Sequence, residues 1–376
     1  MRIKPPYRYD HVGSLMRPET LLRSREEWKA GEISLDELRV HEDKCIKDVI
    51  KLQEEAGLKS ITDGEFRRES FHVDFITQID NITSNWDFAQ TVKLSEDHTA
   101  GLDKKMPFIP YINGRMERPD GGVEVANYNY TKSLTDLTVK ITIPSPTMTH
   151  FRGGREAIDR VAYPLMKDFF EDLARIYREE MADLYEAGCR YVQLDDTNLA
   201  FLCDEKMREN ARALGEDPDE LPATYATLIN ESIKDRPTDM AVCIHLCRDN
   251  ARSQWFASGD YEPIADKMFN LTDVDGFFLE YDDERSGGFE PLRFVPKGNK
   301  AIVLGLVTTK RGQLETKDEL KQRIEDASNY VDIDQLCLSP QCGFSSNAIG
   351  NRINVEDQIG KLRLVKEVAK DVWPDA

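Results

Sequence analysis

The chain has little that would attach it to nucleic acid or to a membrane. Basic residues are outnumbered, with 50 lysines and arginines against 69 aspartates and glutamates, which leaves a formal net charge of −19. Such a chain repels phosphate backbones and anionic lipid, so neither is an expected partner. The sequence has no apolar run of about 18 residues, the length that spans a membrane. Its N-terminal stretch MRIKPPYRYD lacks the apolar core of a signal peptide.

Cysteine is sparse, with seven residues, an odd number, spread over a chain of 376. This usage differs from that of a disulfide-stabilised secreted domain, and it favours a reducing, cytoplasmic compartment. In that setting, cysteines close to histidines indicate metal binding or catalysis rather than disulfides. Low-complexity linkers are also lacking, so we expect one domain over residues 1–376.

Short apolar stretches of strand character alternate with long helical patterns, such as those over residues 35–57 and 163–188. The strand candidates are residues 9–14, 60–65, 139–146, 190–196, 241–247, 276–282, 301–307 and 335–342. Strands that alternate with helices predict parallel βαβ units. Eight such units predict an α/β fold of the closed (β/α)8 TIM-barrel type.

Residues 71–135 interrupt the alternation. They are rich in Asn, Asp, Pro and Tyr, and they contain RPDGGV (118–123), a good turn sequence between two extended arms. We therefore predict an insertion after the second strand, a β-hairpin that lies near the mouth of the barrel.

The stretch AVCIHLC (241–247) ends in a histidine and a cysteine two positions apart. Side chains alternate across a strand, so Val242 and Ile244 face the helices while His245 and Cys247 face the barrel interior. Both lie at the carboxyl end of the strand, where barrel active sites lie. The pattern alone leaves two interpretations open, a strand that merely buries two weakly polar residues and a pair of metal ligands.

Two more strand ends carry ligand-type side chains, Glu280 and Cys342. A carboxylate that follows apolar positions is destabilising unless it is paired or bound to a metal. Together with His245 and Cys247 they offer two thiolates, an imidazole and a carboxylate, a set that suits zinc. Calcium or magnesium would need more oxygen ligands. The alternative is that Glu280 pairs with a nearby arginine and that the cysteines are inert.

Three further polar residues end strands at the same rim, Ser14, Glu65 and Asp195, with Asp63 and Asp196 as competing carboxylates beside them. Acidic groups at the barrel mouth suit a substrate that carries an ammonium group. The alternative is that these residues belong to surface loops and only cap the helices that follow.

These motifs resemble the catalytic half of cobalamin-independent methionine synthase. The resemblance covers most of the chain and rests on the order and spacing of HVGSLMRP, TDGEFRR, QLDDTN, HLC, FLEYDDE and SPQCGF. It implies four ligands for Zn²⁺, which are His245, Cys247, Glu280 and Cys342. It also implies three residues that hold the amino-acid part of homocysteine, which are Ser14, Glu65 and Asp195.

The chemistry of these groups agrees with the resemblance. A free thiol has a pKa near about 8.5 and is mostly protonated at neutral pH. Coordination to zinc deprotonates a thiol, and the bound thiolate is the species that attacks a methyl group. Glu280 is the natural labile ligand, because it is an oxygen donor among softer ligands. We therefore expect a zinc-dependent methyltransferase that converts homocysteine to methionine.

The chain departs from the family on the methyl-donor side. It has no length for the second, N-terminal barrel of the long enzymes. The resemblance implies a histidine at the end of the seventh strand as proton donor, but LGLVTTKRG offers Lys310 there. An expected indole near strand three is missing, and His150 and Phe151 are the candidates to stack on a ligand. The donor therefore stays open between 5-methyltetrahydrofolate, a methylated corrinoid protein and a small methyl donor, and self-association stays open as well.

Two other functions compete with this one. Epoxyalkane:coenzyme M transferase is similar in length and uses the same zinc–thiol chemistry, but its thiol carries a sulfonate, which Glu65 and Asp195 disfavour. The second is a non-catalytic barrel with a structural zinc. Structural zinc sites are usually cysteine-rich and local in sequence, whereas the present set comes from three distant strands and includes a carboxylate.

Overall fold

A parallel sheet of six strands forms the centre of the protein, in the order β10-β9-β8-β7-β6-β5. The structure is a computed structural model that describes residues 4–85, 108–374 and 376. The six strands are β5 (Ile141–Pro144), β6 (Tyr191–Asp196), β7 (Ala241–Leu246), β8 (Gly276–Glu280), β9 (Ala301–Val307) and β10 (Leu336–Pro340). Their spatial order follows their sequence order, so each connection crosses over to the adjacent parallel strand, as in βαβ units.

Short pairings at both edges extend this sheet toward closure. β1 (Ser60–Ile61) pairs in parallel with β4 (Thr138–Val139), which leads directly into β5. At the opposite edge, Tyr9 forms a parallel bridge with Leu338 of β10. The segment around Tyr9 and strand β1 are therefore the two neighbours that must meet to complete the barrel.

Side-chain hydrogen bonds join the first segment to β1. The Ser60 hydroxyl donates to the Asp10 carboxylate at 2.7 Å, and the Thr62 hydroxyl donates to the Gly13 carbonyl at 2.6 Å. All eight predicted stretches thus occupy strand positions of one closed (β/α)8 barrel, which confirms the predicted fold class. The first stretch does so as a bridge rather than as a full strand.

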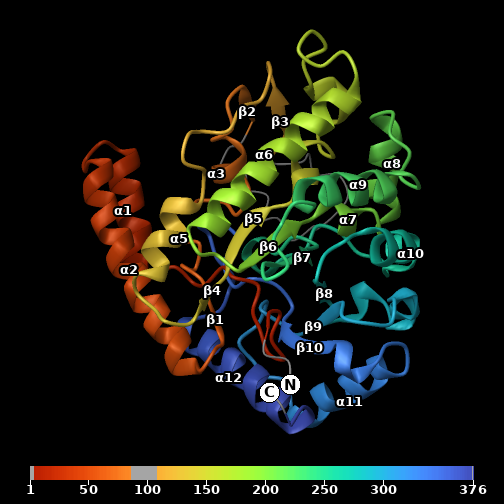
Figure 1. Ribbon diagram of the computed structural model, residues 1–376. Coiled ribbons are helices and arrows are strands. Elements are labelled where there is room, and N and C mark those ends of the chain that lie inside the picture. The colour runs from red at the N-terminus through yellow and green to blue at the C-terminus, as the bar shows by residue number, and fades with distance from the viewer. Residues whose placement is uncertain (1–3, 86–107, 375) are drawn as a thin grey trace.

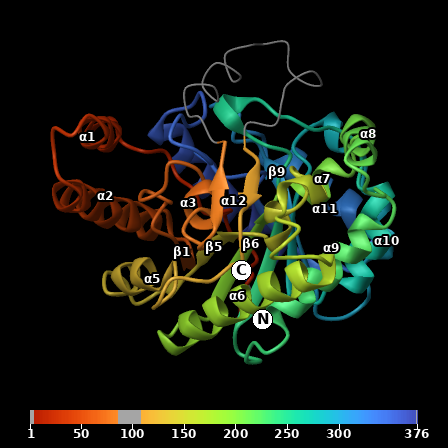
Figure 2. The same cartoon turned by 90° about the horizontal axis from the view of Figure 1, so that it is seen from above.

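Helices form a ring around these strands, and Figure 2 shows the same arrangement from above (Figures 1 and 2). The main ones are α1 (Glu19–Lys29), α2 (Leu35–Ala56), α6 (Met166–Glu186), α9 (Leu221–Ile233), α10 (Glu262–Leu271), α11 (Lys317–Ser328) and α12 (Val355–Val372). The shorter ones are α7 (Asn198–Phe201), α8 (Glu205–Ala213), η1 (Pro146–Thr149), η2 (Gly154–Ala157), η3 (Ala251–Ser253) and η6 (Ile333–Gln335). Between β8 and β9 the described chain forms 3₁₀ turns η4 (Glu284–Ser286) and η5 (Glu290–Phe294) in place of an α-helix, so the predicted alternation breaks there.

Local sequence signals set the ends of the helices. In α2, the Ser34 hydroxyl accepts the Glu37 backbone N–H at 3.2 Å, and the Glu37 carboxylate accepts the Ser34 backbone N–H at 2.8 Å. This reciprocal capping satisfies two N–H groups that the helix itself leaves unpaired. At the other end Gly57 adopts a left-handed conformation with φ of 78°, which a glycine does without strain.

Two separate apolar cores follow from the alternation of side chains along the strands. Val242, Ile244 and Leu246 of β7 belong to the large core between the sheet and the helices. Cys243 belongs to a second, small cluster that also takes Phe278 from β8 and residues from other strands. The side of β7 that carries Cys243 is therefore the interior face, as predicted, and His245 lies on that same face.

The region between β1 and β4 holds short elements. They are α3 (Val73–Ile76), β2 (Ile82–Ser84), β3 (Pro110–Ile112) and α5 (Val125–Lys132). β2 and β3 form an antiparallel pair, and residues 86–107 between them lie outside the described residues. The division into a single barrel domain with residues 71–135 as an insertion near its mouth stays a prediction.

The prediction of a hairpin turn at RPDGGV (118–123) was wrong, because helix α5 follows that turn in place of a second extended arm. Gly122 N–H donates to the Pro119 carbonyl at 3.1 Å, which closes a tight turn. The buried Glu180 carboxylate of α6 then accepts the backbone N–H groups of Val123 and Glu124 at 2.8 to 3.1 Å. This contact with a distant helix fixes the chain at the start of α5.

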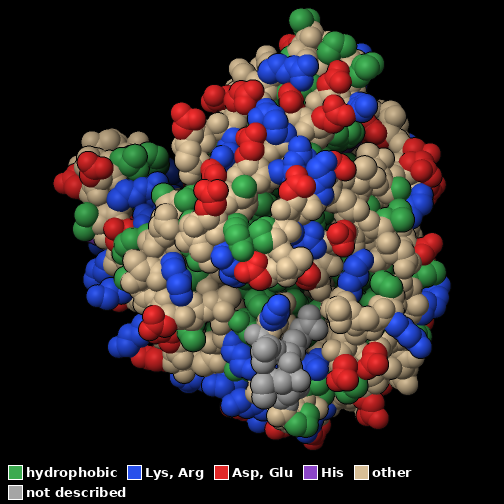
Figure 3. All heavy atoms as spheres, in the orientation of Figure 1, with side chains coloured by type: hydrophobic (Ala, Val, Ile, Leu, Met, Phe, Trp, Pro, Cys, Tyr) green, Lys and Arg blue, Asp and Glu red, His purple; other side chains and the backbone are tan. Residues whose placement is uncertain are grey.

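The surface carries charges of both signs. Figure 3 shows acidic and basic side chains interspersed over the face drawn, with hydrophobic side chains scattered between them. The excess of negative charge is therefore not gathered into one acidic patch on this face. Within the described residues, we find no helix that combines the length and the apolar character needed to cross a membrane.

Gly305 of β9 allows the chain after β10 to cross the end of its neighbouring strand. The register between the two strands shifts between Ser339 and Pro340. Beyond that shift, a Cβ atom on Gly305 would lie 2.7 Å from Gln341 Cα and 2.7 Å from the Leu279 carbonyl oxygen. Both are backbone atoms that cannot rotate away. A strand position without a side chain is thus required for the segment that carries Cys342.

We predict that Gly305→Ala lowers the free energy of unfolding by about 1–3 kcal/mol, the usual range for forced overpacking. The matched control is Gly360→Ala in α12, where the new Cβ would lie 3.6 Å from its nearest neighbour, an atom of Leu314. That change should stabilise the protein by about 0.5–1 kcal/mol, because alanine favours the helix. Urea unfolding of both variants measures the difference. Equal stabilities would contradict the close approach at Gly305.

Candidate metal centre and substrate cavity

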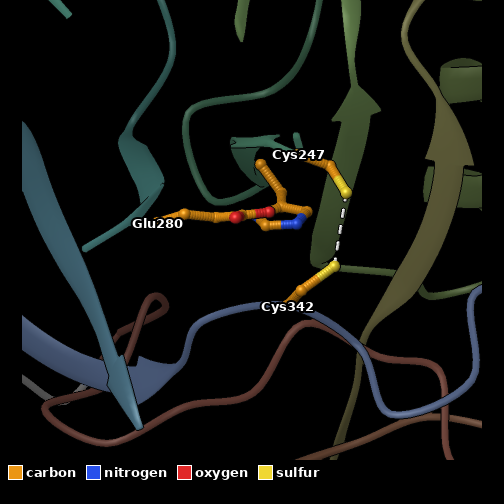
Figure 4. Close-up of side chains that lie close together, drawn as sticks. Cys247, Glu280 and Cys342 are labelled. Atoms are coloured by element: carbon orange, nitrogen blue, oxygen red, sulfur yellow. Dashed lines mark hydrogen bonds between the residues drawn. The ribbon is translucent and has the colours of Figure 1, made fainter. Parts of the chain in front are cut away.

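Four predicted ligands come together at the carboxyl end of the barrel. His245 and Glu280 lie at the ends of β7 and β8, Cys247 follows β7, and Cys342 follows β10. One ligand atom from each lies within 4.8 Å of those from the others, and all four residues are buried. Figure 4 shows Cys247, Glu280 and Cys342 pointing toward one another from three separate segments. The structure therefore brings the whole predicted set to one point.

The contacts within this cluster fit a bound metal ion. The two sulfur atoms of Cys247 and Cys342 lie 3.3 Å apart. Neither ring nitrogen of His245 has a hydrogen-bond partner among the described residues, although the side chain is buried. A buried polar atom without a partner is destabilising, and coordination to a metal would satisfy it. Two thiols, one imidazole and one carboxylate are a donor set that suits zinc.

The protonation of these groups is coupled. Hydrogen bonding with Cys247, together with the nearby imidazole, lowers the pKa of Cys342 to about 7 against the effect of burial. The same contact raises the pKa of Cys247 well above its usual range. Burial lowers the pKa of His245, but Cys342, Asp195 and Glu280 outweigh it and raise that pKa to about 9. Without a metal these groups therefore tend to keep protons, which a metal cation would have to displace.

Glu280 is bonded on both of its oxygen atoms. Its Oε2 pairs with the Arg285 guanidinium, and its Oε1 accepts the Arg248 backbone N–H at 3.0 Å. Burial raises the pKa of Glu280, but Arg285, Lys310 and His245 outweigh burial, so the pKa lies below its usual value. The pairing with an arginine, considered as an alternative from the sequence, is therefore present, although Glu280 also faces the other ligands.

A small cavity of about 20 Å³ adjoins the cluster. It is lined by the two ligand cysteines and His245, by all three residues predicted to hold the substrate, and by further residues from the surrounding loops. These lining residues are Val12, Ser14, Glu65, Phe71, Asp195, His245, Cys247, Cys342, Gly343 and Ser346. The predicted ligands and the predicted substrate residues thus share one space.

The carboxyl groups of Glu65 and Asp195 in the cavity have too few hydrogen-bond and cationic partners to compensate their burial. One oxygen of Glu65 accepts the Thr142 hydroxyl at 2.9 Å, but the other is buried without a hydrogen-bond partner. Glu65 also has a φ of 62°, a strained conformation that recurs at functional sites. Asp195 accepts the Gln193 amide at 2.7 Å. Burial and the neighbouring Glu65 raise the pKa of Asp195 to about 7. A cationic group in the cavity would satisfy both carboxylates.

The competing carboxylates, Asp63 and Asp196, accept hydrogen bonds from nearby loop residues. Asp63 accepts the backbone N–H of Glu65 at 2.8 Å. Asp196 accepts the Thr147 hydroxyl at 2.5 Å and the Leu199 backbone N–H at 2.7 Å. Neither is among the described residues that line the cavity. The structure therefore separates Glu65 and Asp195 from the acidic residues beside them.

Lys310 lies apart from the cavity lining. Its ammonium group pairs with Asp282 and lies 3.4 Å from Asp283. Its role as a proton donor stays a prediction. His150, the candidate to stack on a ligand, is buried beside Tyr225 and Glu216 instead, with its Nδ1 3.0 Å from the Tyr225 hydroxyl. The imidazole thus packs toward α9, and Phe151 packs against Phe201, so a stacking role for either residue stays a prediction.

Two arginines that the sequence analysis did not name organise the site. Arg17 donates to backbone carbonyls of Glu65, Arg68, Ser345 and Asn347, so it joins three loops at the barrel mouth. Arg285 holds Glu280. The only local signal for the second was an arginine that follows the acidic run EYDDE at the end of β8. The motif for the first, HVGSLMR, gave no indication of its partners.

Almost the whole chain matches one known protein family. A family model described as the catalytic domain of cobalamin-independent synthase matches residues 10–371. The uncharacterized protein YxjG of Bacillus subtilis is 43% identical over 374 residues, which cover 99% of this chain and 96% of YxjG. A methionine synthase of Pyrococcus abyssi is 25% identical over 370 residues, which cover 96% of this chain and 92% of that protein.

Two solved structures share the fold. One, from Listeria monocytogenes, is described as a putative vitamin-B12-independent methionine synthase; it is 37% identical, has a TM-score of 0.78, and the match covers 98% of this chain and 99% of that one. The other is a B12-independent methionine synthase from Shewanella sp. W3-18-1 in complex with selenomethionine. It is 19% identical, has a TM-score of 0.71, and the match covers 97% of both chains.

The raised pKa of Asp195 predicts a specific pH dependence of stability. In the metal-free folded protein this carboxyl keeps its proton up to about pH 7, whereas the unfolded chain releases it near 3.8. The folded state therefore binds more protons between these values, and it loses stability as the pH rises through them. We expect Asp195→Asn to remove this loss, so that its stability relative to wild type improves by at least about 1 kcal/mol from pH 5 to pH 8.

Urea unfolding of chelator-treated protein at both pH values measures this effect. Asp120→Asn, on an exposed turn, is the control and should leave the pH dependence unchanged. If Asp195→Asn and wild type lost the same stability over this range, the carboxyl would have an ordinary pKa in the folded protein.

Proposed function

The chain belongs to the family of cobalamin-independent synthase catalytic domains, and we propose that it is a zinc-dependent methyltransferase that forms methionine from homocysteine. The observation that carries this proposal is the single cavity that Cys247 and Cys342 share with Glu65 and Asp195. A thiol that binds with its ammonium group against the two carboxylates has its sulfur directed toward the ligand cluster.

Zinc fits the residues present. His245, Cys247, Glu280 and Cys342 would hold the ion, and it would lower the pKa of a substrate thiol that joins them. The residues of the chain supply the rest of the site. They enclose the sulfur in a buried space, which excludes water, and they fix the amino-acid end at a set distance from the ligands.

The charge of the cavity selects the class of thiol. Glu65 and Asp195 attract an ammonium group and repel a sulfonate, so homocysteine is favoured over coenzyme M, the thiol of the alternative alkyltransferase. A cavity of about 20 Å³ is smaller than homocysteine. We therefore expect the lining to move on binding, at the contact where Phe71 N–H donates to the Ser346 carbonyl at 2.9 Å.

The methyl donor is the least supported part of the proposal. The donor stays open between 5-methyltetrahydrofolate, a methyl-corrinoid protein and a small methyl donor, because the family match names none of them. Lys310 is our candidate to protonate a folate leaving group, and it would have to leave Asp282 to do so. The cytoplasmic location inferred from cysteine usage also stays a prediction. A non-catalytic zinc barrel is the second candidate, but the cavity beside the ligands, with its carboxylates Glu65 and Asp195, disfavours it.

We predict stoichiometric zinc in protein purified without added metal. The double variant Cys247→Ser, Cys342→Ser should bind at least about tenfold less, because zinc prefers thiolate ligands in such a site. Plasma emission of both proteins gives the metal content. The variant should stay folded, since a barrel of this size has a core of its own. Full occupancy in the double variant would contradict the assignment of the ligands.

We also predict that Glu65→Gln and Asp195→Asn weaken homocysteine binding while zinc content stays at the wild-type level. Each change removes one charge-assisted contact, which corresponds to about ten- to hundredfold in affinity. Calorimetry with homocysteine measures the affinity. The controls are Asp63→Asn and Asp196→Asn, the carboxylates that lie outside the cavity lining.

The same proteins test the overall reaction. Zinc-loaded wild type is incubated with homocysteine and either methyltetrahydrofolate or methylcobalamin, and methionine is measured by mass spectrometry. Methionine from either donor supports the proposal and identifies the donor class. Unchanged homocysteine affinity in both cavity variants would show that the ammonium group binds elsewhere or that the substrate is another thiol.

A further inference from the structure

Arg285 connects the metal ligand Glu280 to two other acidic side chains. Its Nη2 pairs with Glu280 and lies 3.4 Å from Asp282, and its Nη1 pairs with Asp283. Only 5% of the Arg285 side chain is exposed, and the carboxylate of Glu280 is fully buried. One guanidinium therefore serves three carboxylates in a largely dry environment, where ion pairs are strong.

The position of Arg285 does not depend on Glu280 alone. Its guanidinium lies over the ring of Trp255, 5.1 Å from the ring centroid. Asp282 and Asp283 also pair with it, and both of them contact Lys310. If Glu280 turned away, Arg285 would still have two carboxylates and the ring of Trp255 as neighbours. The Arg285 guanidinium therefore stays in place whether or not the Glu280 carboxylate pairs with it.

Glu280 itself lies between two cationic positions. Its carboxylate contacts Arg285, yet it also lies within 4.8 Å of the ligand atoms of His245, Cys247 and Cys342. A fully buried carboxylate needs a cation nearby in every arrangement it adopts. The backbone N–H of Arg248, 3.0 Å from Oε1, holds the other oxygen between these positions. The same carboxylate is therefore within reach both of Arg285 and of a cation that binds among the other ligand atoms.

We propose that Arg285 is a positioning residue that competes with the metal for the Glu280 carboxylate and receives it when the thiol substrate takes its place among the ligands. The inference rests on the proposed function. Arg285 compensates the charge of the Glu280 carboxylate whenever that carboxylate is not a ligand. Arg285 thereby weakens the resting metal site and favours binding of the thiol.

This competition predicts effects of opposite sign on two affinities. In Arg285→Met, Glu280 has no alternative cation, so zinc should bind about ten- to hundredfold more tightly, the factor for one charge-assisted hydrogen bond. Homocysteine should bind more weakly to the zinc-loaded variant by a similar factor, because Glu280 is harder to displace. A purely structural role of Arg285 would weaken both.

The zinc affinity is measured by competition with a chromophoric chelator, in the absence of any thiol or methyl donor. The homocysteine affinity is measured by calorimetry on zinc-loaded protein. Arg293→Met is the matched control, since it breaks a surface ion pair with Glu262 and should change neither affinity. In a Glu280→Gln background, Arg285→Met should no longer change the zinc affinity.

Weaker or unchanged zinc binding in Arg285→Met, with wild type behaving as proposed, overturns this inference and leaves the proposed function standing. Circular dichroism verifies the fold. If Arg285→Met does not fold, Arg285→Lys decides the matter, because it keeps the charge but loses the second donor group, and it should shift both affinities in the same directions by a smaller factor. Wild-type protein that binds no zinc would overturn the inference together with the proposed function.

Discussion

Burial of acidic side chains at one end of the barrel is the constraint on which the site depends. Glu65, Asp195 and Glu280 are each at most 4% exposed, and two thiols lie beside them. Such groups destabilise a folded protein unless cations or hydrogen bonds compensate them. The partners differ from one carboxylate to the next, and these differences make the two sides of the site chemically distinct.

Compensation is nearly complete on one side of the cluster and incomplete on the other. Glu280 has Arg285 and a backbone N–H. In the cavity, Arg68 is 3.9 Å from Glu65, and one oxygen of Glu65 has no hydrogen-bond partner. The raised pKa of Asp195 has the same origin, in burial next to a second carboxyl. The negative charge of Glu65 and Asp195 is the less compensated, so a cationic group of the substrate would be stabilised most beside them. Glu280, which has Arg285 as a partner, is the ligand that could exchange partners.

The barrel supports this end with a separate set of interactions inside its interior. Lys140 pairs with Asp10 at 3.2 Å, and both side chains are fully buried. The Tyr191 hydroxyl also donates to Asp10 at 2.9 Å, so this network joins three strand positions. It closes the barrel without help from the ligand cluster. The fold therefore has a source of closure, and a core of its own, that do not depend on a metal at the rim.

The sequence by itself determined the eight strand positions, the face of β7 that looks inward and which four ligand-type side chains meet at the rim. These features repeat along the chain with the period of a strand, and parallel strands bring their carboxyl ends to one rim, so local patterns suffice. Only the tertiary structure decided between Glu65 and Asp63, turned RPDGGV into the start of a helix through Glu180, and assigned Arg285 to Glu280 and Lys310 to Asp282. Each of these outcomes depends on which charged or polar groups come within a few ångströms across different loops and helices. The distances between such groups are set by the packing of the whole chain, so a local sequence pattern does not determine them.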